Sequence, residues 1–385
     1  MPIPAKSLCV VAGEPSGDLH GSLLVAELKR RHPDWSIWGV GSDRMAAAGC
    51  ELWQDARGWA VMGFAEVFRS ILKFRQRLHA LHREIRRRRP DGVILIDFPG
   101  FNLKLAARVH SETIPILYYI VPQLWAWGQG RIKIFERCVD RTIVVFPFEK
   151  EFFRRYGVEA EWVGHPFIDL VRPSAERHVL RERLGVTPSE RLIALMPGVR
   201  VQDLNAHLPL FTETLKLIAE AVPGTRGVIG VHRSLSETTT TLTEGPVPLS
   251  ITPDVYDLMA AADLALTKTG TTTVECAILG TPMVTAYRTG GVNYAIAKRL
   301  VHVPYVAMPN LIAKRRVVPE LIQSGATPVA LAREAVSLLA DDAARQAQVS
   351  GLAEVREKLG PPGAVQRAAT VVEQWLSTGG RRRSA

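Results

Sequence analysis

The amino-acid sequence predicts an α/β protein made of two Rossmann-like, doubly wound parallel-sheet domains that face a cleft. The length of 385 residues, 47% of them hydrophobic, suits two domains with well-buried cores. Short apolar runs alternate with longer segments of helical spacing, as in successive βα units. The alternation breaks at Gly164, His165 and Pro166 and then starts afresh, which places the predicted domain boundary at residue 166.

The first predicted domain, residues 1–166, contains five short strands. Each is a β-branched or apolar run followed by a turn with Gly or Pro, and such runs are typical of parallel strands buried on both faces. A helix follows the first strand at residues 17–31. The predicted strands are residues 7–12, 36–40, 92–96, 116–120 and 141–145.

The second predicted domain, residues 167–345, repeats the pattern after a polar helix at residues 176–184. Its predicted strands are residues 192–196, 227–231, 264–267 and 283–286. Residues 346–385 complete the chain, and we expect their last helix to cross back onto the first domain. The C-terminal helices are predicted at residues 329–339, 343–358 and 364–376, followed by a frayed Arg-rich tail at 381–383.

Composition and charge exclude several classes of protein. No apolar run approaches the ~18 residues that span a bilayer, and the apolar stretch at 8–12 is too short for a signal peptide, so we expect a cytoplasmic protein. The four cysteines are scattered without metal or redox spacing, which indicates buried thiols in a reducing compartment and no metal site. A net charge of +10 favours a polyanionic partner: nucleic acid, an anionic membrane face or phosphorylated substrates.

Candidate functional residues follow the predicted strands, because ligands of open parallel sheets bind beyond the carboxyl ends of the strands. The first such loop contains Gly13, Glu14, Ser16 and Gly17 at the start of a helix. Backbone N–H groups and the positive end of the helix dipole suit a phosphate there. An ordinary capped helix start explains the same residues equally well.

Asp97 follows the apolar strand at residues 92–96 and precedes Phe-Pro-Gly. A carboxylate placed there is partly withdrawn from water, which raises its pKa towards that of a useful general base. A capping role for the next helix is the alternative, and it fits Asn102 better than Asp97. Between residues 118 and 127, two Tyr and two Trp, including Trp125 and Trp127, either fill the core or wall a site for sugars or acyl chains.

Seven segments together resemble the lipid-A-disaccharide synthases. They occur in the family's order and approximate spacing, from about residue 10 to at least residue 325. The aromatic run PQLWAW is the most unusual part of them. The segments are VVAGEPSGD, AVMGFAEV, IDFPGFNL, YYIVPQLWAWGQGR, FPFEK, VGHP and AMPNLIA.

The resemblance implies a glycosyltransferase B fold that uses neither a metal nor a cofactor. It implies UDP-2,3-diacylglucosamine as the donor and 2,3-diacylglucosamine 1-phosphate as the acceptor, with a β-1,6-linked disaccharide phosphate and UDP as products. Asp97 is then expected to deprotonate the acceptor hydroxyl in a single displacement with inversion. The expected acceptor-binding residues are Gly13, Glu14, Ser16, Gly17, Asn102, Trp125 and Trp127.

The donor site is expected in the second domain. Arg200 matches the arginine of the family's Pro-Gly-Ser-Arg segment and is expected to neutralise the leaving diphosphate, which makes it a second catalytic candidate. Hydroxyl side chains stand at the start of the helix that is predicted after residues 264–267. Glu275, one turn into this helix, resembles an acid that binds ribose hydroxyls. A loop with a helix cap is the plainer interpretation of that helix start. The other donor-site candidates are Lys268, Thr269, Gly270, Thr271, Thr272 and Asn310.

The donor half departs from the family pattern at several positions. Val199 stands where the family has Ser, and Thr269 also replaces a usual Ser. Asp203 and Asn205 stand in place of two acidic residues. The reaction class is therefore better predicted than the donor. The alternatives are another UDP-sugar enzyme of this fold, such as a cell-wall UDP-N-acetylglucosamine transferase or a non-hydrolysing epimerase, and a family member with altered or lost activity.

From Phe64 to Ile85, apolar residues recur at close to helical spacing with basic residues between them. Such a helix fits an anionic membrane face, and it also describes a basic helix packed on the sheet. The acylated substrates favour the membrane, so we expect a peripheral protein on the inner face of the inner membrane. Nucleic acid is not an expected partner, because the cations are not interleaved with exposed aromatics. The sequence leaves the oligomeric state open, a homodimer included.

Overall fold

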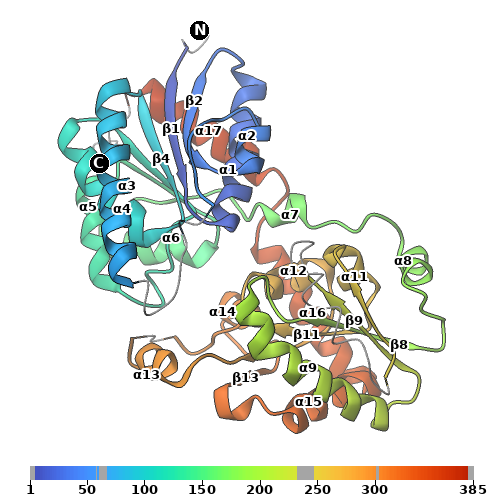
Figure 1. Cartoon of the computed structure of the whole chain (residues 1–385). Helices are drawn as coiled ribbons and strands as arrows, with labels where there is room; N and C mark the ends of the chain where they lie inside the picture. Colours follow the sequence, from blue (N-terminus) through green and yellow to red (C-terminus); the bar gives the residue numbers. More distant parts are fainter. Residues whose placement is uncertain (1–4, 58, 60–66, 232–246, 301–302, 380–385) are drawn as a thin grey trace. The chain divides into compact units, whose positions relative to one another are not determined.

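The computed structural model of the chain divides into two compact units (Figure 1). It describes residues 5–57, 59, 67–231, 247–300 and 303–379. The first unit comprises Met1–Pro166 together with Gly360–Ala385, and the second comprises Phe167–Leu359. Three predicted features lie outside the described residues. They are most of the AVMGFAEV segment, the first residues of the apolar and basic helix that was predicted from Phe64 to Ile85, and the Arg-rich tail.

The first unit is built on a parallel sheet. Its strands are β1 (Ser7–Ala12), β2 (Ser36–Gly41), β3 (Glu51–Asp55), β4 (Gly92–Ile96), β5 (Ile116–Tyr119), β6 (Arg141–Val144) and β7 (Glu161–Trp162). They lie in the order β3-β2-β1-β4-β5-β6-β7. β1 pairs with both β2 and β4, so the chain starts inside the sheet and winds outward in both directions, as in a doubly wound fold.

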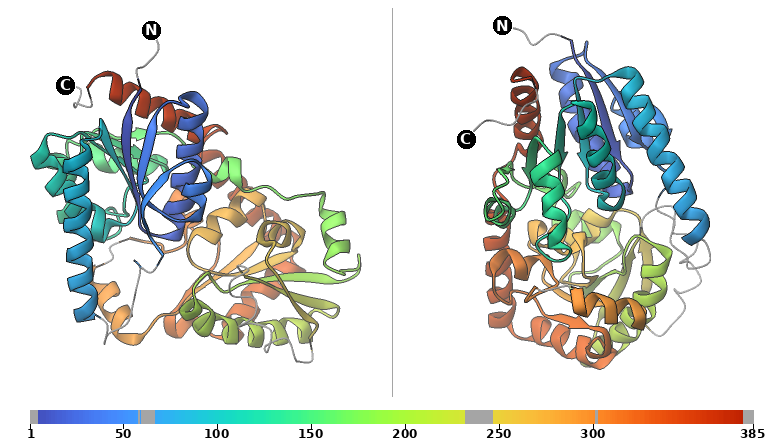
Figure 2. Two further views of the ribbon diagram at one scale, coloured as in Figure 1. Left: turned by 45° about the horizontal axis from the view of Figure 1, so that its top comes forward. Right: turned by 90° about the vertical axis from the view of Figure 1, so that its left-hand side faces the viewer.

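Helices cover both faces of this sheet (Figures 1 and 2). They are α1 (Pro15–Arg31), α2 (Asp43–Ala47), α3 (Val67–Arg88), α4 (Pro99–Val109), α5 (Ile132–Cys138), α6 (Pro147–Arg154) and α17 (Ala364–Ser377). On one face, Leu95 and Tyr118 join a core with residues of α3, α4 and α5. On the other face, α17 packs against α1, and Gly92 gives room to Trp375, because a Cβ atom at Gly92 would be 2.3 Å from the indole.

The second unit is built on a second parallel sheet. Its strands are β8 (Arg191–Met196), β9 (Thr225–Gly230), β10 (Leu249–Thr252), β11 (Leu264–Lys268), β12 (Met283–Tyr287) and β13 (Glu320–Ile322). They lie in the order β10-β9-β8-β11-β12-β13, so β8 and β11 are neighbours. This is again the pattern of a chain that starts centrally and winds outward.

Helices also cover the second sheet (Figure 1). They are α7 (Phe167–Leu170), α8 (Arg177–Arg183), α9 (Val201–Ala221), α11 (Val255–Ala261), α12 (Thr271–Leu279), α13 (Gly291–Leu300), α14 (Met308–Ala313), α15 (Pro328–Ala340) and α16 (Asp342–Lys358). Phe211 of α9 and Leu331 of α15 pack with Leu195 and Leu266 of the sheet. α11 and α12 cover the opposite face, with α16 against α12.

The two parallel sheets confirm the predicted class, an α/β protein with two doubly wound parallel-sheet domains. Every predicted strand is present and lies inside a sheet, whereas the strands that the sequence did not predict, β3, β7, β10 and β13, are the edges. Edge strands lack a neighbour on one side and carry more polar residues, so they show no continuous apolar run. None of the helices in the described part of the chain has both the length and the apolar character needed to cross a membrane.

Candidate functional site

The predicted acceptor-site residues of the first unit lie on loops that leave the same edge of one sheet, or in the first turns of the helices that follow these loops. The strands are parallel, so their carboxyl ends share one edge, and β1, β4, β5 and β6 are consecutive neighbours there. The loops after these strands are residues 13–14, 97–98, 120–131 and 145–146. The structure therefore brings Gly13, Asp97 and the aromatic loop to one edge, although they are distant in sequence.

Asp97 occupies a turn that ordinary side chains disfavour. Its φ is 44° and that of Phe98 is 49°, so two successive non-glycine residues adopt the left-handed conformation. Each such residue costs ~1–3 kcal/mol, and the turn persists only where its surroundings hold it. Asn102 helps to stabilise the turn, because its Nδ2 donates to the carbonyl oxygens of Ile96 (3.1 Å) and Asp97 (2.9 Å). Tyr118 also stabilises it, because its hydroxyl donates to the Asp97 carbonyl oxygen at 2.6 Å.

The electrostatics of this turn suit a base. The pKa of Asp97 is raised to about 6, first by burial and then by the nearby Glu14 carboxylate, against a hydrogen bond from the Phe98 backbone that lowers it. A carboxylate with this pKa is ionised at neutral pH and is a stronger base than an exposed one. The turn therefore presents a held and partly desolvated proton acceptor.

The loop after β1 packs closely against the Asp97 turn. A Cβ atom at Gly13 would lie 2.2 Å from the Phe98 ring, so glycine lets the two loops approach. α1 begins at Pro15, two residues earlier than predicted, with Glu14 at its N-cap and Ser16 exposed. Asp18, in the first turn of this helix, is buried and accepts a hydrogen bond from the backbone of Ser42 at 2.6 Å.

The aromatic loop after β5 holds its two tryptophans differently. Trp127 is 43% exposed, and the guanidinium carbon of Arg131 lies 4.1 Å from its ring centroid. Trp125 is half-buried, and its indole Nε1 donates to Glu149 Oε1 at 3.1 Å. Glu149 was not among the predicted site residues. The available signal was a glutamate three residues after the N-cap Phe146, which is where a capping-box acid stands.

Two buried histidines lie in the same unit. The ring of His165 lies 6.4 Å from that of His20, at close to a right angle. Burial lowers the pKa of His20 to about 4 and that of His165 to about 3, the latter also through its neighbour. Both rings are therefore neutral at physiological pH, so neither replaces Asp97 as an acid or base with a pKa near neutrality.

In the second unit, the Arg200 loop and the start of α12 leave the same edge of the sheet. Arg200 follows β8 and is the N-cap of α9, where its side chain is exposed. α12 begins at Thr271 after Gly270, directly beyond β11, the neighbour of β8. Lys268, at the end of β11, forms an ion pair with Asp203 at 3.0 Å. A cation and two helix starts at one edge are suited to phosphate oxygens.

Glu275 lies one turn into α12. Burial raises its pKa to about 7, and hydrogen bonds with Tyr256 and Thr272 oppose the rise. The Tyr256 hydroxyl is 3.5 Å from Glu275 Oε1. Thr269 is buried and donates its backbone N–H to the carbonyl oxygen of Ala286. The predicted donor residues from 268 to 275 therefore form one continuous strand end and helix start.

Asn310 is fully buried in α14, and its amide is engaged within the protein. Its Oδ1 accepts the backbone N–H groups of Val317 and Val318 at 2.7 and 2.9 Å. Its Nδ2 donates to the Val318 carbonyl oxygen and to Glu320. These bonds shape the segment before β13, and a donor-binding role for Asn310 stays a prediction, as does an acceptor-binding role for the equally buried Asn102.

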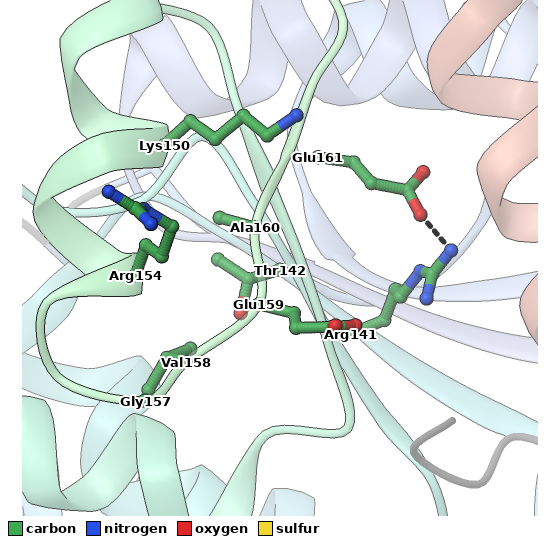
Figure 3. Close-up of a pocket in the computed structure, with 9 residues that line it drawn as sticks. All are labelled: Arg141, Thr142, Lys150, Arg154, Gly157, Val158, Glu159, Ala160 and Glu161. Carbon is green, nitrogen blue, oxygen red and sulfur yellow. Dashed lines mark hydrogen bonds and ion pairs between the residues drawn. The ribbon is translucent and has the colours of Figure 1, made fainter. Parts of the chain in front are cut away.

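A cavity of about 390 Å³ lies at the opposite edge of the first sheet (Figure 3). It adjoins the amino ends of β6 and β7 and the end of α6, away from the predicted loops. Arg141 and Glu161 form an ion pair across one side of it. In the described part of the chain, no three His, Cys, Asp or Glu side chains come together as a metal site.

Solved structures share this two-unit architecture. The superposition with a calicheamicin glycosyltransferase has a TM-score of 0.63 at 18% identity, covering 97% of this chain and 99% of the other. That with MnaA from S. aureus, in a structure with UDP, has a TM-score of 0.66 at 11% identity, covering 98% and 99%. The chain therefore has the glycosyltransferase B fold.

The sequence comparisons identify the family among proteins with this fold. The family described as lipid-A-disaccharide synthetase matches residues 8–373. A lipid-A-disaccharide synthase of Geobacter metallireducens is 39% identical over 376 residues, which cover 97% of this chain and 98% of that protein. The chain belongs to the lipid-A-disaccharide synthetase family, whose members are hexosyltransferases of lipid A biosynthesis.

Proposed function

We propose that the chain joins UDP-2,3-diacylglucosamine to 2,3-diacylglucosamine 1-phosphate and releases UDP and the β-1,6-linked disaccharide 1-phosphate. The observation that carries the proposal is the Asp97 turn: a partly buried carboxylate with a pKa of about 6, held in a strained conformation at the carboxyl edge of the sheet. Strain and a perturbed pKa at one residue are typical of a catalytic group.

In the proposed reaction, Asp97 accepts the proton of the acceptor's primary hydroxyl as that oxygen attacks the anomeric carbon of the donor. The new glycosidic bond forms while the bond from the anomeric carbon to the diphosphate oxygen breaks. The electron pair leaves with UDP, and the configuration at carbon is inverted. No covalent intermediate with the enzyme is needed.

The second unit supports the donor end of this reaction. The developing negative charge on the diphosphate requires positive partners, and Arg200, Lys268 and the start of α12 supply them at one sheet edge. Glu275, held next to Tyr256, is placed one turn further to accept hydrogen bonds from ribose hydroxyls. MnaA, a protein of the same fold, carries UDP in its structure, which is in line with this assignment.

We also propose that the protein is cytoplasmic and docks on an anionic membrane through the amino-terminal end of α3. Leu78, Leu81 and Ile85 of the predicted apolar stripe are buried against the sheet, so this half of the helix serves the core. Leu72 is 61% exposed and is followed by the exposed Lys73. We expect binding to anionic vesicles and release at high salt; equal binding to neutral vesicles would contradict an electrostatic dock.

The test of the proposed function is a turnover assay with the two acylated glucosamine substrates. We expect a disaccharide 1-phosphate and UDP in equal amounts. Thermal unfolding gives a rapid companion test, in which UDP raises the Tm and DNA or RNA does not. UDP release without disaccharide, or no turnover by protein that binds UDP, would overturn the proposed reaction.

A further inference from the structure

Glu149 is a buried carboxyl group that the proposed reaction does not use. It lies in the first turn of α6, after β6, with 1% of its surface exposed. A buried carboxylate is costly unless several hydrogen bonds compensate it. Glu149 follows β6, and the aromatic loop of the proposed acceptor site follows β5. Because β5 and β6 are neighbours in the sheet, Glu149 lies next to that loop.

The two oxygens of Glu149 connect two loops of that site. Oε2 accepts the backbone N–H groups of Phe146 at 3.1 Å and Val145 at 3.3 Å, which closes the start of α6. Oε1 accepts the indole N–H of Trp125 at 3.1 Å. One side chain therefore fixes both the helix start after β6 and an aromatic ring of the loop after β5.

This bond determines what Trp125 offers to a ligand. Its indole N–H is engaged by Glu149, and its ring system lies perpendicular to the Phe148 ring, with 5.0 Å between the ring centroids. The remaining accessible part is carbon, which suits the C–H face of a sugar ring rather than a hydroxyl. Trp127 differs, because Arg131 lies over its ring and its side chain is more exposed.

We propose that Glu149 is a positioning residue for the acceptor: it holds the Trp125 ring in the orientation that supports the acceptor sugar while Asp97 takes the proton. The inference rests on the proposed function, because it assigns the acceptor to this edge of the sheet. Glu149 itself touches neither substrate.

The charge state of Glu149 is consistent with this role. Burial raises its pKa to about 7, the Asp97 carboxylate adds to the rise, and the N–H groups of Phe146, Trp125 and Val145 oppose it. The ionised form accepts all three N–H groups through its two oxygens. Glutamine is nearly isosteric, but its amide nitrogen cannot accept a hydrogen bond, so Glu149→Gln loses part of this set without leaving a cavity.

A double-mutant cycle of Glu149→Gln and Trp125→Phe tests the proposal, with disaccharide formation as the readout. Trp125→Phe keeps an aromatic ring and removes the N–H. We expect Glu149→Gln to raise the acceptor KM about tenfold in the wild-type background and to have little further effect beside Trp125→Phe, with UDP affinity unchanged. A merely structural role predicts instead the same loss in both backgrounds, and that result, or an unchanged acceptor KM, would overturn the proposal.

A second measurement does not depend on turnover or on the Glu149 variant. In protein labelled with ¹⁵N-tryptophan, the indole signals are assigned by their loss in Trp125→Phe and Trp127→Phe. We expect the Trp125 indole N–H to exchange with solvent much more slowly than that of Trp127, and to shift when glucosamine 1-phosphate is added. Equal exchange rates would refute the Glu149 bond even if the chain proves to have another activity; protection without a shift would refute its role at the acceptor.

Discussion

Asp97 in the first unit is held in a left-handed turn by hydrogen bonds from Asn102 and Tyr118, whereas Arg200 in the second unit is exposed at the start of a helix. Both follow a central strand of a parallel sheet. The first arrangement fixes a base and withdraws it from water, which favours proton transfer. The second offers cations and helix starts, which favour the binding of a charged group. In the proposed function, the carboxyl edge of the sheet therefore provides the chemistry in the first unit and the anion binding in the second.

The buried acids of the two units sharpen this contrast. The pKa of Asp97 and that of Glu275 are both raised by burial, to about 6 and about 7. Asp97 is influenced next by another carboxylate, Glu14, whereas Glu275 is within 3.5 Å of the Tyr256 hydroxyl. The negative charge of Glu14 makes Asp97 a stronger base, whereas Glu275, beside a hydroxyl group, is suited to accept hydrogen bonds from a ligand.

The largest expected effect is that of Asp97→Asn. Loss of a general base lowers kcat by roughly 10²–10⁴-fold, whereas UDP affinity, measured by calorimetry, should be unchanged because it depends on the second unit. Asp34→Asn, at an exposed position before β2, is the matched control and should be fully active. Near-normal turnover of Asp97→Asn would remove the assignment of chemistry to the first unit.

The same variant should be more stable at neutral pH. Asp97 titrates near pH 6 in the folded protein and near an ordinary carboxyl value of about 4 when unfolded, so its ionisation weakens folding as the pH rises across this window. The penalty is complete above about pH 6. We expect a higher Tm for Asp97→Asn at pH 8 and no gain at pH 3. This result would show that the ionised Asp97 destabilises the folded protein, as is common for catalytic residues.

Arg200→Ala should have the next largest effect, a loss of about 10²-fold in kcat/KM for the donor with weaker UDP binding. The matched control is Arg191→Ala, because Arg191 is exposed at the amino end of β8, the strand whose carboxyl end leads to Arg200. Equal losses in the two variants would mean that net charge, rather than the sheet edge, determines donor binding.

Variants of Lys268 and Asp203 should change the affinity for UDP by a smaller factor and in opposite directions. The ion pair between these two residues competes with any diphosphate for Lys268. We expect Lys268→Gln to weaken UDP binding about threefold and Asp203→Asn to strengthen it by a similar factor, in titrations at low salt. The opposite sign for Asp203→Asn would place the diphosphate away from Lys268.

The smallest expected effect is that of Glu14→Gln. Removal of this carboxylate lowers the pKa of Asp97, because the Glu14 charge is the second cause of its rise after burial. The pH-dependence of activity should therefore move to lower pH by less than the whole displacement of the Asp97 pKa. An unchanged pH profile would show that Glu14 does not affect the pKa of Asp97. A shift to higher pH would mean that Glu14 lowers that pKa, which is the opposite of the expected effect.

The sequence predicted the centre of each sheet and missed its edges for one reason. β1 and β4 are buried on both faces and appear as continuous apolar runs, whereas β3, with the sequence ELWQD, is an edge strand with charged residues. The loops after the central strands were therefore located correctly. The positions of Asp97 and Arg200 after a strand followed from this pattern.

The contacts between loops could not be predicted from the same pattern. Nothing near Asp97 in the sequence indicates that Asn102 and Tyr118 hold its carbonyl oxygen, because those bonds depend on a left-handed turn. The bond from Trp125 to Glu149 joins loops that follow different strands. The order of strands in the sheet, which a single sequence does not specify, creates these contacts.

The most direct test of the central claim is the pH profile of kcat/KM for the acceptor, which reports ionisations of the free enzyme. Because Asp97 acts when deprotonated, kcat/KM should rise through about pH 6 in a step that is absent from the residual activity of Asp97→Asn. Ionisation of Glu149 near pH 7 should add a smaller rise, of at most about tenfold, which remains in Asp97→Asn. A rise centred near pH 4, or one at pH 6 that persists in Asp97→Asn, would contradict the assignment of Asp97 as the base.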